Sequence, residues 1–82
     1  MYLAKINVVL KKSILDPQGQ TILHALENLN YNTVKEVRIG KYIEVKIDVE
    51  DQSTAENIVN EISKKLLSNP VMENYYFSLE KL

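Results

Sequence analysis

Few side chains in this 82-residue chain could do chemistry, and none has an evident set of partners. The only histidine, His24, could be a general base or a metal ligand, but a metal site needs several convergent ligands. Carboxylates cluster at Glu44, Asp48, Glu50 and Asp51, and paired carboxylates can do acid–base work. Their alternation around Lys46 is more typical of a solvated strand face. The absence of cysteine excludes disulfides, zinc–thiolate sites and thiol nucleophiles.

The most informative stretch is Arg38-Ile39-Gly40-Lys41-Tyr42. Two cations and a tyrosine surround a glycine at a predicted hairpin tip, and arginine and tyrosine are common anchors of protein interfaces. The stretch is either a loop that contacts a partner or an anion, or a plain turn with soluble flanks. No Walker loop, dinucleotide fingerprint, nucleophile elbow or HExxH motif occurs, which lowers the expectation of an enzyme that works alone.

The elements that must position these residues follow from hydrophobic periodicity and capping signals. Strands are expected at Tyr2–Lys11, Val34–Ile39, Ile43–Val49 and over residues 74–79. One helix is expected between Asp16-Pro17 and Asn30-Tyr31-Asn32, and another between a capping box at Ser53-Thr54-Ala55-Glu56 and Asn69-Pro70. The apolar set Tyr2, Ala4, Ile6, Val8 and Leu10 should face the core, and the mixed opposite set predicts a central strand.

The order β-α-β-β-α-β predicts a single α+β domain over residues 1–82 with a ferredoxin-like fold. We expect a four-stranded antiparallel sheet with both helices on one face. The other face, with Leu3, Val9, Tyr42 and Tyr76, would stay open. Bringing the apolar sides of the two middle strands to one face requires an extra residue or a bulge close to Gly40.

Nucleic acid and membrane are not expected partners. Ten basic and eleven acidic residues give a formal net charge of −1. RNA-recognition motifs share the element order and stack bases on sheet aromatics, but their aromatic signature is missing around Tyr42. No apolar run approaches the ~20 residues of a membrane span, and no signal-peptide pattern opens the chain, so we expect a cytoplasmic protein.

An ordered set of short motifs, spanning nearly the whole chain, resembles the PurS family, the small subunit of formylglycinamidine ribonucleotide synthase. The motifs are Leu15-Asp16-Pro17-Gln18-Gly19, His24-Ala25-Leu26, Val37-Arg38-Ile39-Gly40-Lys41-Tyr42, Lys65-Leu66-Leu67-Ser68-Asn69-Pro70-Val71 and Glu73-Asn74-Tyr75.

The resemblance implies a non-catalytic subunit that is needed for two larger subunits to associate. These are an ATP-dependent synthase (PurL type) and a glutaminase (PurQ type), and ammonia would pass between them. ATP, Mg and glutamine would be used by those partners, and this chain would bind no cofactor and no metal. A homodimer or homotetramer is expected. The expected partner contacts are Asp16, Gln18, Gly19, Arg38, Gly40, Lys41 and Tyr42.

Two other classes of function stay open from the residues. A ferredoxin-like module could instead be a regulatory domain that senses a small metabolite. A small acylphosphatase-like hydrolase would need a phosphate-binding loop after the first strand, and Lys11-Lys12-Ser13-Ile14-Leu15 contains no glycine-rich cradle.

Overall fold

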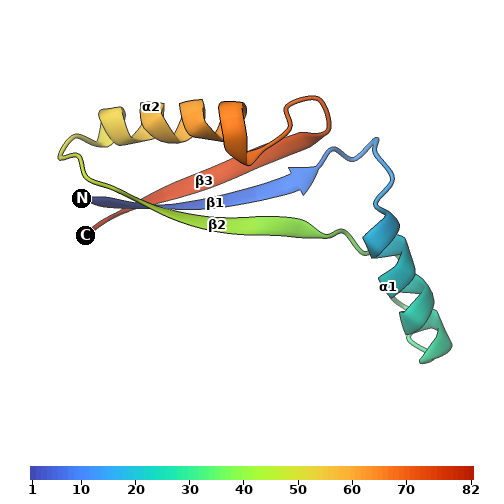
Figure 1. Ribbon diagram of the computed structural model, residues 1–82. Coiled ribbons are helices and arrows are strands. Elements are labelled where there is room, and N and C mark those ends of the chain that lie inside the picture. Colours follow the sequence, from blue (N-terminus) through green and yellow to red (C-terminus); the bar gives the residue numbers. More distant parts are fainter.

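The computed structural model describes all 82 residues, and its centre is one antiparallel sheet (Figure 1). The strands are β1 (Tyr2–Leu10), β2 (Gly40–Ile47) and β3 (Glu73–Lys81), in the order β2-β1-β3. The helices are α1 (Pro17–Asn28) and α2 (Gln52–Ile62), and α2 continues into the short π-helix η1 (Ser63–Leu67). The prediction that the first strand is central is confirmed, because β1 pairs with both neighbours.

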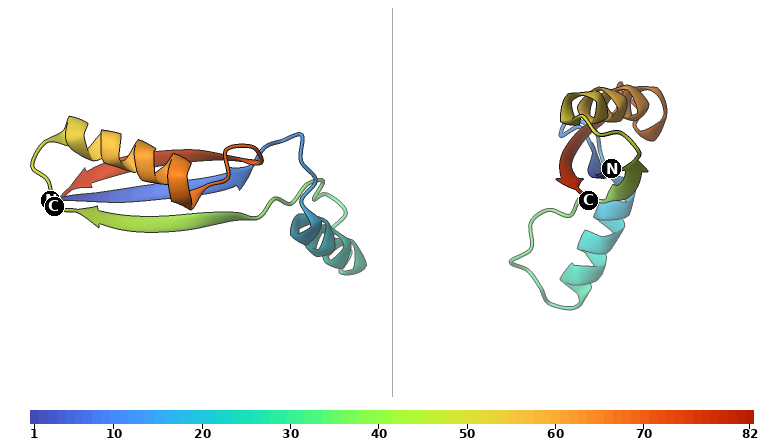
Figure 2. Two further views of the ribbon diagram at one scale, coloured as in Figure 1. Left: turned by 45° about the horizontal axis from the view of Figure 1, so that its top comes forward. Right: turned by 90° about the vertical axis from the view of Figure 1, so that its left-hand side faces the viewer.

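The hydrophobic core lies between one face of the sheet and α2. Ala4, Ile6 and Val8 of β1 are fully buried, and Ala55 and Val59 of α2 are buried with them. Cross-strand pairs extend this face sideways, since Ile6 lies opposite Ile43 on one side and Phe77 on the other. The predicted inward face of β1 is therefore confirmed, and Ile43 and Phe77 pack against the same core. Figure 2 shows α2 lying along this face of the sheet.

The prediction of a fourth strand at Val34–Ile39 is wrong. The chain from residue 33 to residue 39 has no regular structure, and the Ile39 amide donates to the Asp16 side chain at 2.6 Å. Gly40 begins β2 opposite Val9, so the hairpin and the bulge expected near Gly40 do not form. In a ferredoxin-like sheet the missing strand would lie beside β2. The outer edge of β2 is consequently unpaired.

The prediction of two helices on one face is also wrong for α1. Only α2 covers the sheet, and α1 projects beyond its end (Figures 1 and 2). The molecule measures 51 × 27 × 14 Å, with a radius of gyration of 16.4 Å. A compact chain of this length would have a radius of gyration of about 12 Å. The difference arises because α1 is held to the segment that follows it and not to the sheet.

The predicted ends of α1 are confirmed, but the predicted start of the second helix is not. Asp16 caps α1 as predicted, and Asn30, just after α1, adopts a positive φ of 68°. The second helix begins two positions earlier than expected, because its N-cap is Asp51 and not Ser53. The Asp51 carboxylate accepts from the Thr54 amide and from the Ser53 and Thr54 hydroxyls, so the predicted capping box does not form. None of the helices has both the length and the apolar character needed to cross a membrane.

Candidate partner-binding site

The two motifs predicted to contact a partner meet at the end of the sheet from which α1 projects. An open pocket of about 290 Å³ lies between them. Four of the seven predicted residues line it together with Leu10, Pro17, Ile39 and Glu73; the four are Asp16, Gln18, Gly40 and Lys41. The fold thus brings together positions that are more than 20 residues apart in the sequence.

Asp16 is the link between the two motifs. Its side chain is 4% exposed, and its two oxygens accept from the Gly19 amide at 3.0 Å and from the Ile39 amide at 2.6 Å. These backbone hydrogen bonds, that from Ile39 first, hold the pKa of the Asp16 carboxyl below its ordinary value. The carboxylate therefore shapes the pocket, and because Asp16 is almost fully buried it offers little surface to a partner.

Two glycines allow the close backbone contacts around this junction. A Cβ on Gly19 would overlap the carbonyl group of Val37, so α1 and the returning segment can touch only with glycine at this position. A Cβ on Gly40 would lie 2.7 Å from the carbonyl oxygen of Val8 on the neighbouring strand. Both glycines are explained by the packing of the chain on itself.

Arg38 also has a partner within the chain. One guanidinium nitrogen, Nη2, donates to the Lys11 carbonyl at 2.9 Å, and Nε lies 4.0 Å from a Glu36 carboxylate oxygen. The Arg38 side chain keeps 29% of its surface exposed. It ties the end of β1 to the segment that enters β2.

Apart from Gly40, which has no side chain, the exposed members of the predicted set are Gln18, Lys41 and Tyr42. The Lys41 ammonium donates to the Leu67 carbonyl at 3.3 Å and lies 3.9 Å from the Glu73 carboxylate. Tyr42 lies on the open face of the sheet, outside the pocket, where its hydroxyl donates to Glu44 at 3.0 Å. These three side chains present the groups that a partner could reach.

The other candidate chemical groups do not converge. His24 is exposed on α1, and the carboxylates between residues 44 and 51 are exposed around the opposite end of the sheet. No three His, Asp or Glu side chains are arranged to hold a metal ion. The pKa of the Asp51 carboxyl is lowered mainly by the Ser53 and Thr54 hydroxyls, which is the effect of a helix cap.

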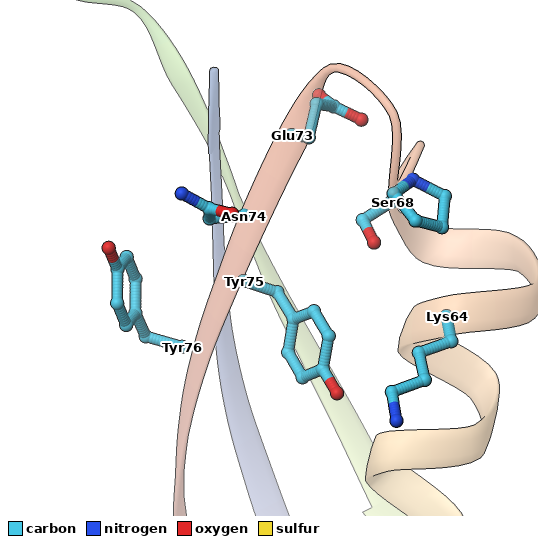
Figure 3. Close-up of a pocket in the computed structure, with 7 residues that line it drawn as sticks. Lys64, Ser68, Glu73, Asn74, Tyr75 and Tyr76 are labelled. Atoms are coloured by element: carbon cyan, nitrogen blue, oxygen red, sulfur yellow. The ribbon is translucent and has the colours of Figure 1, made fainter. Parts of the chain in front are cut away.

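Sequence reasoning missed the contribution of β3 to this end of the molecule. A pocket of about 450 Å³ lies between η1, the loop after it and β3, and Figure 3 shows Lys64 directed toward Tyr75 within it. Tyr75 and Tyr76 point to opposite sides of β3, as successive strand residues do.

A third pocket, of about 750 Å³, lies against Tyr76 on the open face of the sheet, and Arg38 also lines it. The alternation of β3 predicts which way Tyr76 points, but only the tertiary structure places it opposite Asn7 of β1, where it lines the same pocket as Lys11.

The chain is similar to known proteins over its whole length. Residues 3–81 match the model of the family described as "PurS: Phosphoribosylformylglycinamidine (FGAM) synthase". The PurS subunit of phosphoribosylformylglycinamidine synthase from Bacillus subtilis is 45% identical over 82 residues, covering 100% of this chain and 96% of the relative.

Solved structures agree with this match. The crystal structure of Methanocaldococcus jannaschii PurS, a subunit of formylglycinamide ribonucleotide amidotransferase in the purine biosynthetic pathway, superposes with a TM-score of 0.88 and 41% identity, covering 100% of this chain and 99% of that chain. A chain of the PurLQS structure from Thermotoga maritima superposes with a TM-score of 0.87 and 32% identity, covering 96% of both. The chain belongs to the PurS family, which supplies a subunit of phosphoribosylformylglycinamidine synthase in purine biosynthesis.

Proposed function

We propose that this chain is the organising subunit of a three-part phosphoribosylformylglycinamidine synthase. None of its own side chains takes part in the covalent steps of the reaction. The chain joins a glutaminase of the PurQ type to an ATP-dependent synthase of the PurL type in the cytoplasm. The observation that carries the proposal is the match, over 96% of both chains, to a chain of the PurLQS structure from Thermotoga maritima. ATP, Mg and glutamine are used by the partner subunits, and this chain binds no cofactor.

The chemistry of ammonia explains why an organiser is needed. Ammonia that escapes into water is protonated and loses its nucleophilic lone pair. Holding the glutaminase and the synthase in fixed contact shortens the path and excludes water from it. A subunit with no reactive group of its own can therefore be essential for glutamine-dependent synthesis.

The pocket between the two predicted motifs is the proposed docking site. Gln18 and Lys41 are exposed there and make the contacts, and Tyr42 adds a contact outside the pocket, on the open face of the sheet. Asp16, Gly19, Arg38 and Gly40 hold the two motifs in place. Lys41 can offer charge-assisted hydrogen bonds to a partner, because its contact with Glu73 is long, at 3.9 Å.

Self-association into a homodimer or homotetramer is also proposed. The outer edge of β2 is unpaired, and several large apolar side chains of α1 and its surroundings remain exposed. They are Leu15, Ile22, Leu29 and Tyr31. Covering such surfaces in a second copy would add the apolar burial that a small chain lacks.

A double variant tests the docking site. Gln18→Ala with Lys41→Ala should weaken association with the glutaminase and synthase and reduce glutamine-dependent synthesis, while synthesis from added ammonia persists. The matched control is Gln20→Ala with Lys46→Ala, which removes the same side chains from exposed positions on α1 and β2 that do not line the pocket.

Sedimentation of the mixed subunits and the two activities are the measurements. Equal assembly and equal glutamine-dependent activity in both variants would remove the docking role from this pocket. Full glutamine-dependent activity of the two larger subunits without this chain would overturn the organising function itself. Tight binding of a nucleotide or amino acid to the lone chain would favour a metabolite sensor instead.

A further inference from the structure

The formal net charge of −1 conceals an uneven distribution along the molecule. One end of the sheet carries both termini (Figure 1). We assign residue 5, residues 44–56 and residues 78–82 to this end, and together they contain six carboxylates and three lysines. The rest of the chain holds seven cations and five carboxylates. The end from which α1 projects is therefore positive relative to the other end, although the composition alone indicates an almost neutral protein.

The positive charge is concentrated at the largest pocket, which we call the basic pocket. It has a volume of about 750 Å³ on the open side of the sheet. Lys11, Lys12 and Arg38 line it against one carboxylate, Glu36. The other lining residues are Val9, Leu10, Ser13, Asn74 and Tyr76. The basic pocket thus combines a net positive charge with an aromatic ring and two aliphatic side chains.

The backbone that carries the two lysines is held in place. The Lys11 carbonyl accepts from Arg38 Nη2 and from the Ile14 amide, each at 2.9 Å, and the Lys11 amide donates to the Met72 carbonyl at 2.9 Å. The two lysines thus lie on a turn that is hydrogen-bonded to Arg38, in the segment before β2, and to Met72, in the loop before β3. Because the backbone of the turn is already ordered, binding there costs less conformational entropy than binding to a mobile loop.

The two lysines have no carboxylate partner within the chain. The four ion pairs of the structure involve Lys5, Arg38, Lys41 and Lys65, and none involves Lys11 or Lys12. A negatively charged ligand can therefore pair with both without breaking an existing contact. Tyr76, which is 61% exposed, offers an aromatic ring beside them, and tyrosine and arginine are enriched among interface anchors.

The surroundings favour a short acidic segment over a long polyanion. Alternate residues of a strand share a face, so Tyr76, Ser78 and Glu80 of β3 all lie on the open face of the sheet. On β2, Glu44 follows Tyr42 on that face. Lys5 and Lys46 lie on the same face, and Lys5 pairs with Glu80 at 3.1 Å, so the two carboxylates and the two lysines balance. A nucleic acid strand that continued over the sheet would therefore meet no further net positive charge, whereas two or three partner carboxylates would be matched within the basic pocket.

We propose that the basic pocket binds an acidic segment of a partner subunit in the assembled enzyme. This inference rests on the organising function and adds the chemistry of one contact, at a site separate from the pocket that holds Gln18 and Lys41. Opposite charges at such a contact steer the encounter and set which surface docks, and their effect weakens with salt.

The test is a charge reversal with a matched control. Lys11→Glu with Lys12→Glu should weaken assembly with the glutaminase and synthase roughly tenfold or more at low salt, because two ion pairs are replaced by repulsion. Lys46→Glu with Lys81→Glu makes the same change in net charge at exposed positions on the other part of the sheet and should leave assembly within about twofold. Lys11→Gln with Lys12→Gln, checked by thermal melting, gives a milder variant in case the reversal disturbs the turn.

The dependence of the association constant on salt separates the outcomes. The wild-type constant should fall as salt rises, and the Lys11/Lys12 variants should show a flatter dependence than the control. Equal affinity and equal salt dependence in all variants would overturn the acidic-segment proposal while leaving the organising function intact. Failure of the wild-type chain to assemble would overturn both. Binding of ATP or a single-stranded oligonucleotide to the lone wild-type chain, lost in the Lys11/Lys12 variants, would assign the basic pocket to that ligand instead.

Discussion

The molecule has two regions, and only one of them buries hydrophobic side chains. The body, residues 1–10 and 40–82, contains the sheet, α2 and η1, and it holds all seven buried hydrophobic residues. The arm, residues 11–39, contains α1, and its only buried residues are Asp16 and Gly19. Both helices have apolar side chains at helical spacing. The difference shows that such a stripe predicts a helix that needs a partner surface, without saying where that surface lies.

The largest expected contrast is between one isoleucine in each region. Ile6→Ala should lower the free energy of unfolding by about 2–5 kcal/mol, because it leaves a cavity in the core. Ile22→Ala on α1 should change it by less than about 0.5 kcal/mol in the isolated chain, since that side chain is 40% exposed. Urea unfolding of both variants measures the difference. Similar losses would mean that the arm is packed as tightly as the body.

The junction between the regions should respond next most strongly. Gly19→Ala places a methyl group against the Val37 carbonyl and should cost about 1–3 kcal/mol through displacement of the returning segment. Hydrogen exchange at the Ile39 amide should accelerate with it. Gln20→Ala, at an exposed position of the same helix, is the control and should be neutral or slightly stabilising. Unchanged exchange in Gly19→Ala would show that the arm is not held at this contact.

Within the body, the buried serine that begins η1 and the one that follows it should have effects of opposite sign. Ser63 Oγ is buried without a hydrogen-bond partner, so Ser63→Ala should raise the free energy of unfolding by about 1 kcal/mol. Ser68 Oγ donates to the Ser63 carbonyl at 2.8 Å, and Ser68→Ala should lower it by about 1 kcal/mol. Thermal melts of both variants test this, and a loss of stability in Ser63→Ala would contradict it.

The smallest expected effect is the pH dependence of the arm. The pKa of Asp16 is lowered in the folded chain, mainly by the Ile39 amide, so its ionised form favours the anchored arm. That stabilisation is present above the ordinary carboxyl pKa of about 4 and is lost as the pH falls through the lower folded value. The amide resonances of Gly19 and Ile39, followed by NMR, should shift over this range.

Asp16→Asn is the matched control for this titration. The amide has one acceptor oxygen, so it cannot accept from both backbone amides through two oxygens as the carboxylate does. The pH response of the Ile39 resonance should disappear in this variant, whereas responses near Asp51, the capping carboxylate of the body, should persist. A titration of Ile39 that survives Asp16→Asn would assign the effect to another group.

The sequence predicted local features well and failed where a distant segment decided the outcome. Asp16-Pro17 and Asn30 carry their own chemistry, so the limits of α1 could be placed from neighbouring residues alone. The segment Val34–Ile39 has strand-forming residues, yet a carboxylate more than 20 positions earlier takes the amide of Ile39. The docking residues were proposed from resemblance, and only the structure separates those that hold the chain together from those that remain exposed.

Alternation and capping in the sequence determined the central strand, the inward face of β1 and the start of α1. These features depend on side-chain period and on hydrogen bonds between near neighbours. The tertiary structure alone decided that α1 leaves the sheet, that β2 keeps an open edge, and that Lys11, Lys12, Arg38 and Tyr76 meet at one pocket. Each of these depends on which distant backbone groups pair, and no local pattern of residue types specifies that choice.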